Sequence, residues 1–223
     1  MTEELKSFLA FDLGHMNEDA FPNKRTDIPY CDDPELLMDI YYPEEKKDTY
    51  PVFLIVFGGG WISGFRRSRF VEYMLKPLQM GYACAVAQYT LSLDDTFPRP
   101  VIDLKKAVNY LHTHAQELLL DTDNLTLWGE SAGGHLALET ALLPNERLGL
   151  TGLNTEVKNL VIFYPTTDCD TIDRYAETEK DRHLRPDSVM GIFLSSGLND
   201  PQTLDLASPA HWIHPGMPRL WLQ

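Results

Sequence analysis

The pentapeptide Gly129-Glu130-Ser131-Ala132-Gly133 limits most strongly what this chain can fold into. The apolar run 125–128 before it predicts a strand, and the small and aliphatic residues 132–143 after it predict a helix. A serine between a strand and a helix occupies a tight, strained turn that closes only when its neighbours are small. In this setting G-x-S-x-G is typical of a nucleophile elbow, and it places the Ala132 amide at a helix N-terminus, where the amide can meet an oxyanion.

A second glycine motif, Phe57-Gly58-Gly59-Gly60-Trp61, follows the continuous apolar run 52–57. A strand that is apolar on both faces belongs in the middle of a covered, mostly parallel sheet. Backbone N–H groups of a glycine-rich loop at the end of such a strand can supply half of an oxyanion hole. Because neither Lys-Ser nor Lys-Thr follows the glycines and no G-x-G-x-x-G opens a helix, the sequence disfavours a nucleotide-binding loop.

The remaining patterns alternate between strand-like and helix-like segments. We expect strands at residues 36–42, 52–57, 82–87, 125–128, 157–164 and 220–223, and helices at 70–79, 100–117 and 132–143. This alternation predicts a doubly wound α/β fold, a mostly parallel sheet with helices on both faces, in a single domain over 1–223. The charged, weakly periodic segment from Asp168 onward (168–215) is expected to be an excursion or cap-like segment over the sheet edge or site mouth.

Composition limits the partners and the compartment. The formal net charge of −14 disfavours nucleic acids and anionic membranes as partners. Residues 1–20 lack a secretory pattern, and no apolar run reaches the ~20 residues of a membrane span. The widely spaced Cys31, Cys84 and Cys169 are typical of free thiols, so we expect a cytoplasmic protein.

Several ordered motifs together resemble the α/β-hydrolase esterases and lipases of the hormone-sensitive-lipase-like and feruloyl-esterase-like (BD-FAE-like) branch. The resemblance covers about 37–223 and rests on Gly-Gly-Gly-Trp at 58–61, Tyr89, Phe97-Pro98, Pro100-x-x-Asp103, Gly-Glu-Ser-Ala-Gly-Gly at 129–134, Tyr164-Pro165 and Ala207-Ser208-Pro209. It implies an α/β-hydrolase fold and a serine carboxylesterase that acts on a small or aromatic-acyl ester through an acyl-enzyme on Ser131. It also implies an oxyanion hole from the amides of Gly58, Gly59 and Ala132, and neither a metal nor an organic cofactor.

The sequence departs from that family at two places. Phe57 takes the position of a histidine that usually braces the glycine loop, which bears on loop orientation rather than on proton transfer. The family's catalytic acid and histidine follow the strand that corresponds to 220–223, and the chain ends at Gln223, so we expect a C-terminally truncated domain without its final strand and helices. The exposed edge strand that results predicts a homo-oligomer.

Residues within the chain offer few substitutes for the acid and the base. Asp168 follows the strand 157–164 at its carboxyl end and is the acid candidate, with a helix cap or turn acid as the alternative interpretation. We identify no triad histidine, because each position fits an ordinary surface or packing histidine: His112, His114, His135, His183, His211 and His214.

Three interpretations share this fold and differ in activity. The chain is a serine esterase, active through an unusual base or when completed by another chain. Alternatively it is a catalytically incomplete hydrolase-fold remnant that serves as a binding module. A third interpretation is that it is a fragment of a longer protein. The preferred ester depends on the shape of the pocket, which a sequence pattern does not give.

Overall fold

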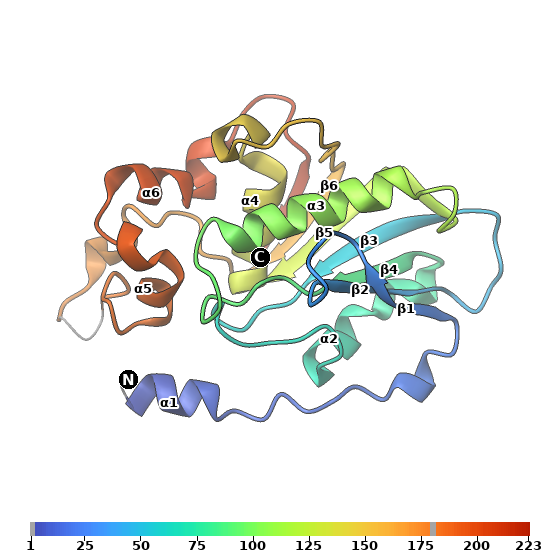
Figure 1. The fold of residues 1–223 in the computed structure, drawn as a ribbon, viewed down its shortest axis with the longest axis horizontal. Coiled ribbons are helices and arrows are strands. Elements are labelled where there is room, and N and C mark those ends of the chain that lie inside the picture. The colour runs from blue at the N-terminus through green and yellow to red at the C-terminus, as the bar shows by residue number, and fades with distance from the viewer. Residues whose placement is uncertain (1–2, 179–181) are drawn as a thin grey trace.

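A computed structural model describes residues 3–178 and 182–223 (Figure 1). The strands are β1 (Lys24–Pro29), β2 (Leu37–Tyr41), β3 (Tyr50–Val56), β4 (Ala83–Ala87), β5 (Leu120–Glu130), β6 (Asn159–Phe163) and β7 (Arg219–Leu222). The α-helices are α1 (Glu3–Leu9), α2 (Arg69–Met74), α3 (Arg99–Thr113), α4 (Ala132–Leu142), α5 (Val189–Leu194) and α6 (Pro201–Leu206). Short 3₁₀ helices lie at Glu18–Ala20, Lys76–Met80, Asn145–Leu148, Ile172–Tyr175, Ser195–Gly197 and Pro209–Trp212.

The strands form one seven-stranded sheet in the order β1-β2-β4-β3-β5-β6-β7. β4, β3, β5, β6 and β7 run parallel, while β2 is antiparallel to both β1 and β4. β3 and β4 occupy the middle, and β4 is buried along its whole length. The apolar runs therefore lie where a sheet covered on both faces needs them, which confirms the predicted mostly parallel sheet.

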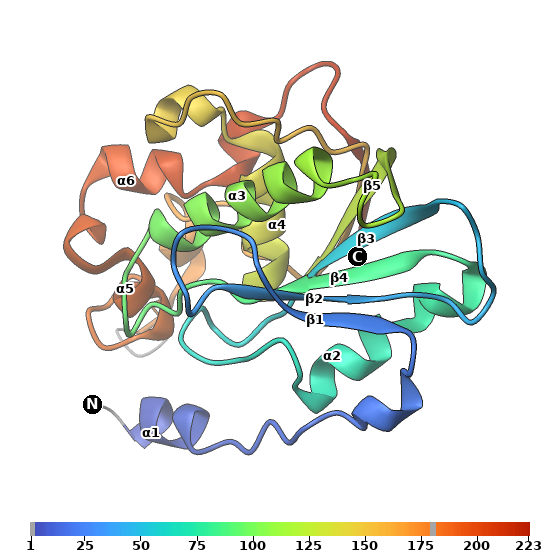
Figure 2. The ribbon, with the colours of Figure 1, turned by 45° about the vertical axis from the view of Figure 1, so that its right-hand side comes forward.

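Helices cover both faces of this sheet. α3 and α4 pack against each other on one face, and α4 also contacts β5 and β6. α2 lies on the other face, with α1 on the same side (Figures 1 and 2). In α3 the stripe Val101, Leu104, Val108 and Leu111 is fully buried, as its spacing predicts. The doubly wound arrangement is confirmed.

Some boundaries differ from those expected. β1 was not predicted: half-buried and exposed residues alternate along this antiparallel edge strand, so it carries no apolar run. The helix expected over 70–79 ends at Met74 and continues as a 3₁₀ helix that contains Pro77, because proline cannot donate the next helical hydrogen bond. Gly81 then closes this segment in the left-handed region (φ 82°).

The segment 168–215 holds α5, α6 and three of the 3₁₀ helices; its residues 179–181 lie outside the described part. Met190, Phe193 and Leu198 are buried in the same hydrophobic cluster as the sheet. Much of the segment therefore shares the core of the domain.

β7 forms one edge of the sheet, and Leu220, Trp221 and Leu222 are each more than a third exposed. Of the helices that the structure describes, none combines the length and the apolar character that a bilayer crossing requires.

Candidate active site

Ser131 lies in the turn between β5 and α4. Its backbone is in the left-handed region, at φ 51° and ψ −126°, a conformation that costs energy for a residue other than glycine. The Ser131 amide donates to the Phe163 carbonyl of β6 (3.0 Å), and the Ser131 carbonyl accepts from the His135 amide (3.0 Å). The turn is therefore held on both sides, while the serine side chain is exposed.

The glycines around Ser131 are required by close approach of the backbone. A Cβ atom at Gly133 would lie 2.1 Å from the Val56 carbonyl oxygen and 2.4 Å from that of Phe57. At Gly129 a Cβ atom would lie 2.3 Å from the Gly133 carbonyl oxygen. Helix α4 can start against the end of β3 only because both side chains are absent.

The glycine loop lies directly against this turn. A Cβ atom at Gly58 would lie 2.9 Å from the Glu130 carbonyl oxygen and 3.5 Å from Ser131 Cβ. The Gly59 carbonyl accepts from the amides of Ile62 (3.2 Å) and Ser63 (3.0 Å), which curls the loop after β3. The structure therefore brings the loop and the serine together, as the sequence predicts.

Phe57 anchors the start of the loop by packing. Its ring stacks on Tyr89, with 4.5 Å between ring centroids and 19° between planes. The Tyr89 hydroxyl donates to the Phe57 carbonyl (2.8 Å). Tyr89, one of the motif residues, thus packs on and hydrogen-bonds to Phe57, which takes the position of the histidine that usually braces this loop in the family.

Ala132 is the first residue of α4 and is buried beside Ser131. The first amides of a helix have no intrahelical acceptor and lie at its positive end. The Ala132 amide is thus a hydrogen-bond donor next to the serine.

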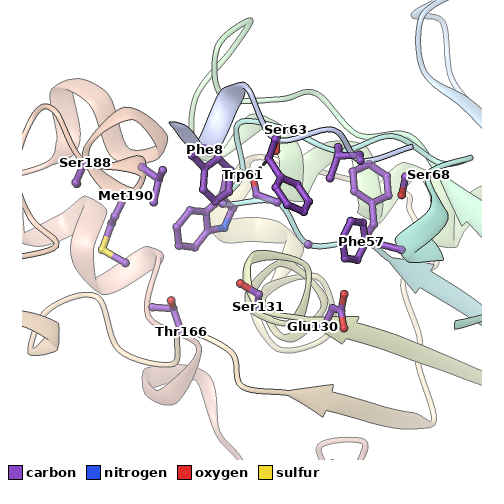
Figure 3. Close-up of a pocket in the computed structure, with 18 of the residues that line it drawn as sticks. Phe8, Phe57, Trp61, Ser63, Ser68, Glu130, Ser131, Thr166, Ser188 and Met190 are labelled. Atoms are coloured by element: carbon purple, nitrogen blue, oxygen red, sulfur yellow. Dashed lines mark hydrogen bonds between the residues drawn. The ribbon is translucent and has the colours of Figure 1, made fainter. Parts of the chain in front are cut away.

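A cavity of about 810 Å³ opens beside Ser131, and Gly58 and Gly59 line it (Figure 3). Most of the other lining is apolar, including Phe8, Phe11, Trp61, Phe70, Val189 and Met190. Figure 3 shows Ser131 and Glu130 on one side, with Phe57, Trp61 and Phe8 on the other. A largely apolar cavity with a few polar groups is suited to a small organic ligand.

Glu130 also lines this cavity, and sequence reasoning treated it only as the variable position of the elbow. Its Oε2 accepts from the hydroxyls of Tyr164 (2.8 Å) and Tyr73. Burial raises the pKa of the Glu130 carboxyl, against the lowering effect of the Tyr164 hydrogen bond. The contact could have been predicted from Tyr164, which is one of the motif residues in the sequence.

Asp168, the acid candidate, lies in a local turn. Its carboxylate accepts from the amides of Asp170 and Thr171 (both 3.0 Å) and from the Thr171 hydroxyl (2.7 Å). Partial burial acts to raise its pKa, but the Thr171 hydrogen bonds and the other contacts lower it overall. Asp168 does not belong to the described residues that line the Ser131 cavity, and its hydrogen bonds are those of a turn acid. His211 Nε2 also lies 4.0 Å from Asp168 Oδ1.

His183 is the one histidine among the described residues that lines the cavity with Ser131. Its Nδ1 lies 3.4 Å from Asp173 Oδ1, and its side chain is 57% exposed. Burial acts to raise the pKa of Asp173, but hydrogen bonds from the amides of His183 and Leu184 and from Arg182 lower it. Within 3–178 and 182–223, no hydrogen bond joins the Ser131 side chain to an imidazole.

The other histidine candidates are not among the described residues that line the cavity, but His135 accepts a hydrogen bond from the lining residue Trp61 (3.2 Å). His112 contacts the Glu156 carbonyl, His114 the Tyr110 carbonyl, His135 the Ala207 carbonyl, His211 the Asp205 carboxylate and His214 the Pro215 carbonyl. The described residues contain no cluster of three or more metal-ligating side chains.

Comparison with known proteins gives consistent matches. The family model BD-FAE matches residues 38–222. The probable carboxylic ester hydrolase LipM of Mycobacterium tuberculosis is 33% identical over 123 residues, which are 54% of this chain and 28% of LipM. Esterase LipQ of the same organism is 26% identical over 199 residues, which are 86% of this chain and 46% of LipQ.

Among solved structures, esterase B from Lactobacillus rhamnosis superposes with a TM-score of 0.76 at 21% identity, over 97% of this chain and 69% of that one. Another structure of esterase B is named as tributyrin phosphonate inhibited. The chain spans less than half the length of both LipM and LipQ.

Proposed function

The chain belongs to the BD-FAE family, in the hormone-sensitive-lipase-like branch of the α/β-hydrolase esterases, and on that premise we propose that it hydrolyses small or aromatic-acyl carboxylic esters through Ser131. One observation carries the proposal: the serine of the strained turn and the glycine loop line the same apolar cavity. Esterases among its relatives support the reaction class.

In the proposed reaction Ser131 Oγ attacks the ester carbonyl carbon and loses its proton to a base. The carbonyl oxygen becomes an oxyanion that accepts hydrogen bonds from the amides of Gly58, Gly59 and Ala132. The bond to the alcohol oxygen then breaks, and the alcohol leaves with that proton. In the second half of the reaction a water molecule gives a proton to the base and attacks the acyl carbon. The bond between that carbon and Ser131 Oγ then breaks, Ser131 takes the proton back from the base, and the carboxylic acid leaves. Each oxyanion donor is typically worth a factor of about 10² to 10³ in rate.

The cavity supports the expected substrate class. Its volume of about 810 Å³ accommodates a small or aromatic acyl group, and its aromatic lining offers flat apolar surfaces. Phe11 and Phe70 lie 5.8 Å apart between ring centroids and are both partly exposed at the cavity. An apolar acyl group would cover these rings when it binds.

We propose His183 as the base that accepts the Ser131 proton. His183 lines the cavity, and the neighbouring Asp173 carboxylate can hold its imidazole in one orientation. Replacing His183 with alanine should abolish ester turnover if this pair serves Ser131. If turnover is retained, the base lies elsewhere, in this chain or in another one.

A fluorophosphonate probe tests the proposal without a choice of substrate, because it reacts only with an activated serine. Intact-mass analysis of the purified chain should show one covalent adduct, and peptide mapping should place it on Ser131. Ser131→Ala is the matched control and should stay unlabelled. Absence of labelling in the unmodified chain would contradict the proposal.

The alternative function is a binding module on a hydrolase fold. It is favoured by the absence, within the described residues, of a hydrogen bond between Ser131 and a histidine. In that case the serine stays unlabelled while the cavity still binds a small aromatic ester, which isothermal titration calorimetry would measure.

The cytoplasmic location expected from the cysteines stays a prediction.

A further inference from the structure

His135 occupies an unusual position behind the glycine loop. It lies on α4, one turn after Ser131, and is fully buried. The Trp61 indole Nε1 donates to His135 Nδ1 (3.2 Å), and His135 Nε2 contacts the Ala207 carbonyl oxygen (3.0 Å). One imidazole thus connects the loop after β3 to the segment that follows α6.

The two partners determine which nitrogen of the imidazole carries the proton. An indole N–H can only donate, so Nδ1 must present its lone pair to Trp61. A carbonyl oxygen can only accept, so Nε2 carries the proton and donates it to Ala207. Burial lowers the pKa of His135 to about 4, in keeping with this neutral form.

Trp61 is the last residue of the glycine loop, and its backbone is in the left-handed region (φ 62°). Bulky side chains rarely adopt this conformation, so surrounding contacts must hold it. The Trp61 ring stacks on Phe193, with 4.7 Å between centroids, and its carbonyl accepts from the Ser92 amide (2.8 Å). The bond to His135 is the hydrogen bond that fixes the indole itself.

Glu139 and Cys169 lie near the imidazole, and Lys105 lies farther away, at the end of α4. Glu139 Oε1 lies 4.0 Å from His135 Nε2, and burial raises the pKa of Glu139. Lys105, on α3, donates to the Thr140 and Leu143 carbonyls at the end of α4. Cys169 Sγ contacts the same Ala207 oxygen that His135 does (3.0 Å).

We propose that His135 is a positioning residue for the oxyanion loop: its Nδ1 holds Trp61 and thereby fixes the Gly58 and Gly59 amides relative to Ser131. The catalytic consequence rests on the proposed esterase function. The effect of His135 on the position of the glycine loop does not depend on that function, because it involves no reaction.

Two substitutions of similar size separate the two hydrogen bonds of His135. In His135→Asn the amide oxygen takes the place of Nδ1 and can still accept from Trp61, but the donor to Ala207 is lost. In His135→Gln the longer side chain can still donate to Ala207, but the acceptor for Trp61 is lost. Each variant keeps one of the two bonds, so each is the control for the other.

Two readouts are then compared. On p-nitrophenyl butyrate, His135→Gln should lower kcat by about 30-fold with KM within about twofold, because a displaced oxyanion loop weakens only the transition state. His135→Asn should keep kcat within about threefold of the unmodified chain. Amide hydrogen exchange at residues 58–62, which requires no turnover, should accelerate in His135→Gln and not in His135→Asn.

Trp61→Phe is the second test, because it keeps an aromatic ring next to Phe193 and removes the N–H donor together with part of the indole ring. It should behave like His135→Gln in both readouts. Equal kcat and equal exchange in the two His135 variants would overturn the proposal, as would a Trp61→Phe variant with an unchanged loop. If the unmodified chain shows no turnover, the esterase proposal fails, and hydrogen exchange alone decides whether His135 positions the loop.

Discussion

The cavity beside Ser131 is lined by two regions that are built in different ways. Residues 57–61 and 129–133, which we call the glycine wall, approach one another through backbone atoms, so closely that a Cβ atom does not fit at Gly58, Gly129 or Gly133. Phe8, Phe11 and residues 182–190, which we call the side-chain wall, come from segments far apart in the sequence, and most of them are partly exposed, whereas Met190 is buried. The region proposed for chemistry is therefore fixed by backbone sterics, and the region proposed for substrate choice by side-chain packing.

The largest effect should follow from a methyl group placed in the glycine wall. In an ordinary helix, glycine to alanine stabilises by about 1 kcal/mol. In Gly133→Ala, however, the new Cβ atom would meet the Val56 and Phe57 carbonyl oxygens, so we expect the free energy of unfolding to fall by about 3 kcal/mol or more. Urea denaturation measures this change.

Gly149→Ala is the matched control for that variant. Nothing lies within 4 Å of a Cβ atom there, and the only cost is the left-handed backbone (φ +66°), about 1–2 kcal/mol. A Gly133→Ala protein as stable as the unmodified chain would show that the start of α4 can move away from the end of β3. Backbone contact would then not be what fixes the glycine wall.

The next effect concerns the buried imidazole behind the glycine wall. The pKa of His135 is lowered by burial from 6.5 to about 4. Between these values the unfolded chain binds a proton that the folded chain does not, so the stability due to His135 is lost as the pH falls through this window. The full loss is on the order of 3 kcal/mol. The difference in unfolding free energy between the unmodified chain and His135→Asn, measured from pH 7 to pH 4, should shrink accordingly.

Glu139→Gln provides a control of opposite sign. Burial raises the pKa of Glu139 above its ordinary 4.5, so the folded chain keeps a proton that the unfolded chain has lost, and stability is lost as the pH rises above 4.5. The difference between the unmodified chain and this variant should therefore shrink as the pH increases. The same slope in both variants would contradict the charge states assigned here.

A smaller effect is expected in the side-chain wall. The Phe8 ring lies against the glycine loop, 3.0 Å from the position of a Cβ atom at Gly60, and is 38% exposed. Phe8→Ala should change the free energy of unfolding by less than about 1 kcal/mol but lower kcat/KM for an aromatic-acyl ester by about tenfold relative to an acetyl ester. Tyr175→Ala, at a side chain 85% exposed and outside the cavity, is the control. An unchanged preference between the two esters would show that Phe8 does not contribute to substrate selection.

The smallest effect concerns the edge strand β7, which belongs to neither wall. We propose that two copies of the chain associate through this edge, because Leu220, Trp221 and Leu222 are exposed along it. Leu222→Lys should lower the weight-average mass in sedimentation equilibrium, with little change in stability or in ester turnover. A monodisperse monomer over a wide concentration range, with or without the substitution, would rule this association out.

The glycine wall could be predicted from the sequence because its signals are local. Ser131, Gly58, Gly59 and Ala132 lie within short motifs whose spacing and flanking strands determine the backbone path. The central strands were predictable for the same reason, since a continuous apolar run suits only the middle of a covered sheet.

The side-chain wall could not be predicted because long-range packing creates it. Phe8 reaches the cavity from the N-terminal helix, and His183 from a charged segment without periodicity. The role of His135 was missed for a related reason. Its position one turn after Ser131 is local, but its partners, Trp61 and Ala207, are each more than 70 residues away.

The central claim is that Ser131, in the glycine wall, performs ester hydrolysis. The most direct test is the hydrolysis of p-nitrophenyl butyrate by the purified chain beside its Ser131→Ala variant. We predict turnover that saturates with substrate in the unmodified chain and falls by at least about 10³-fold in the variant. Equal rates in both proteins would contradict the claim and show that the glycine wall has a structural but no catalytic role.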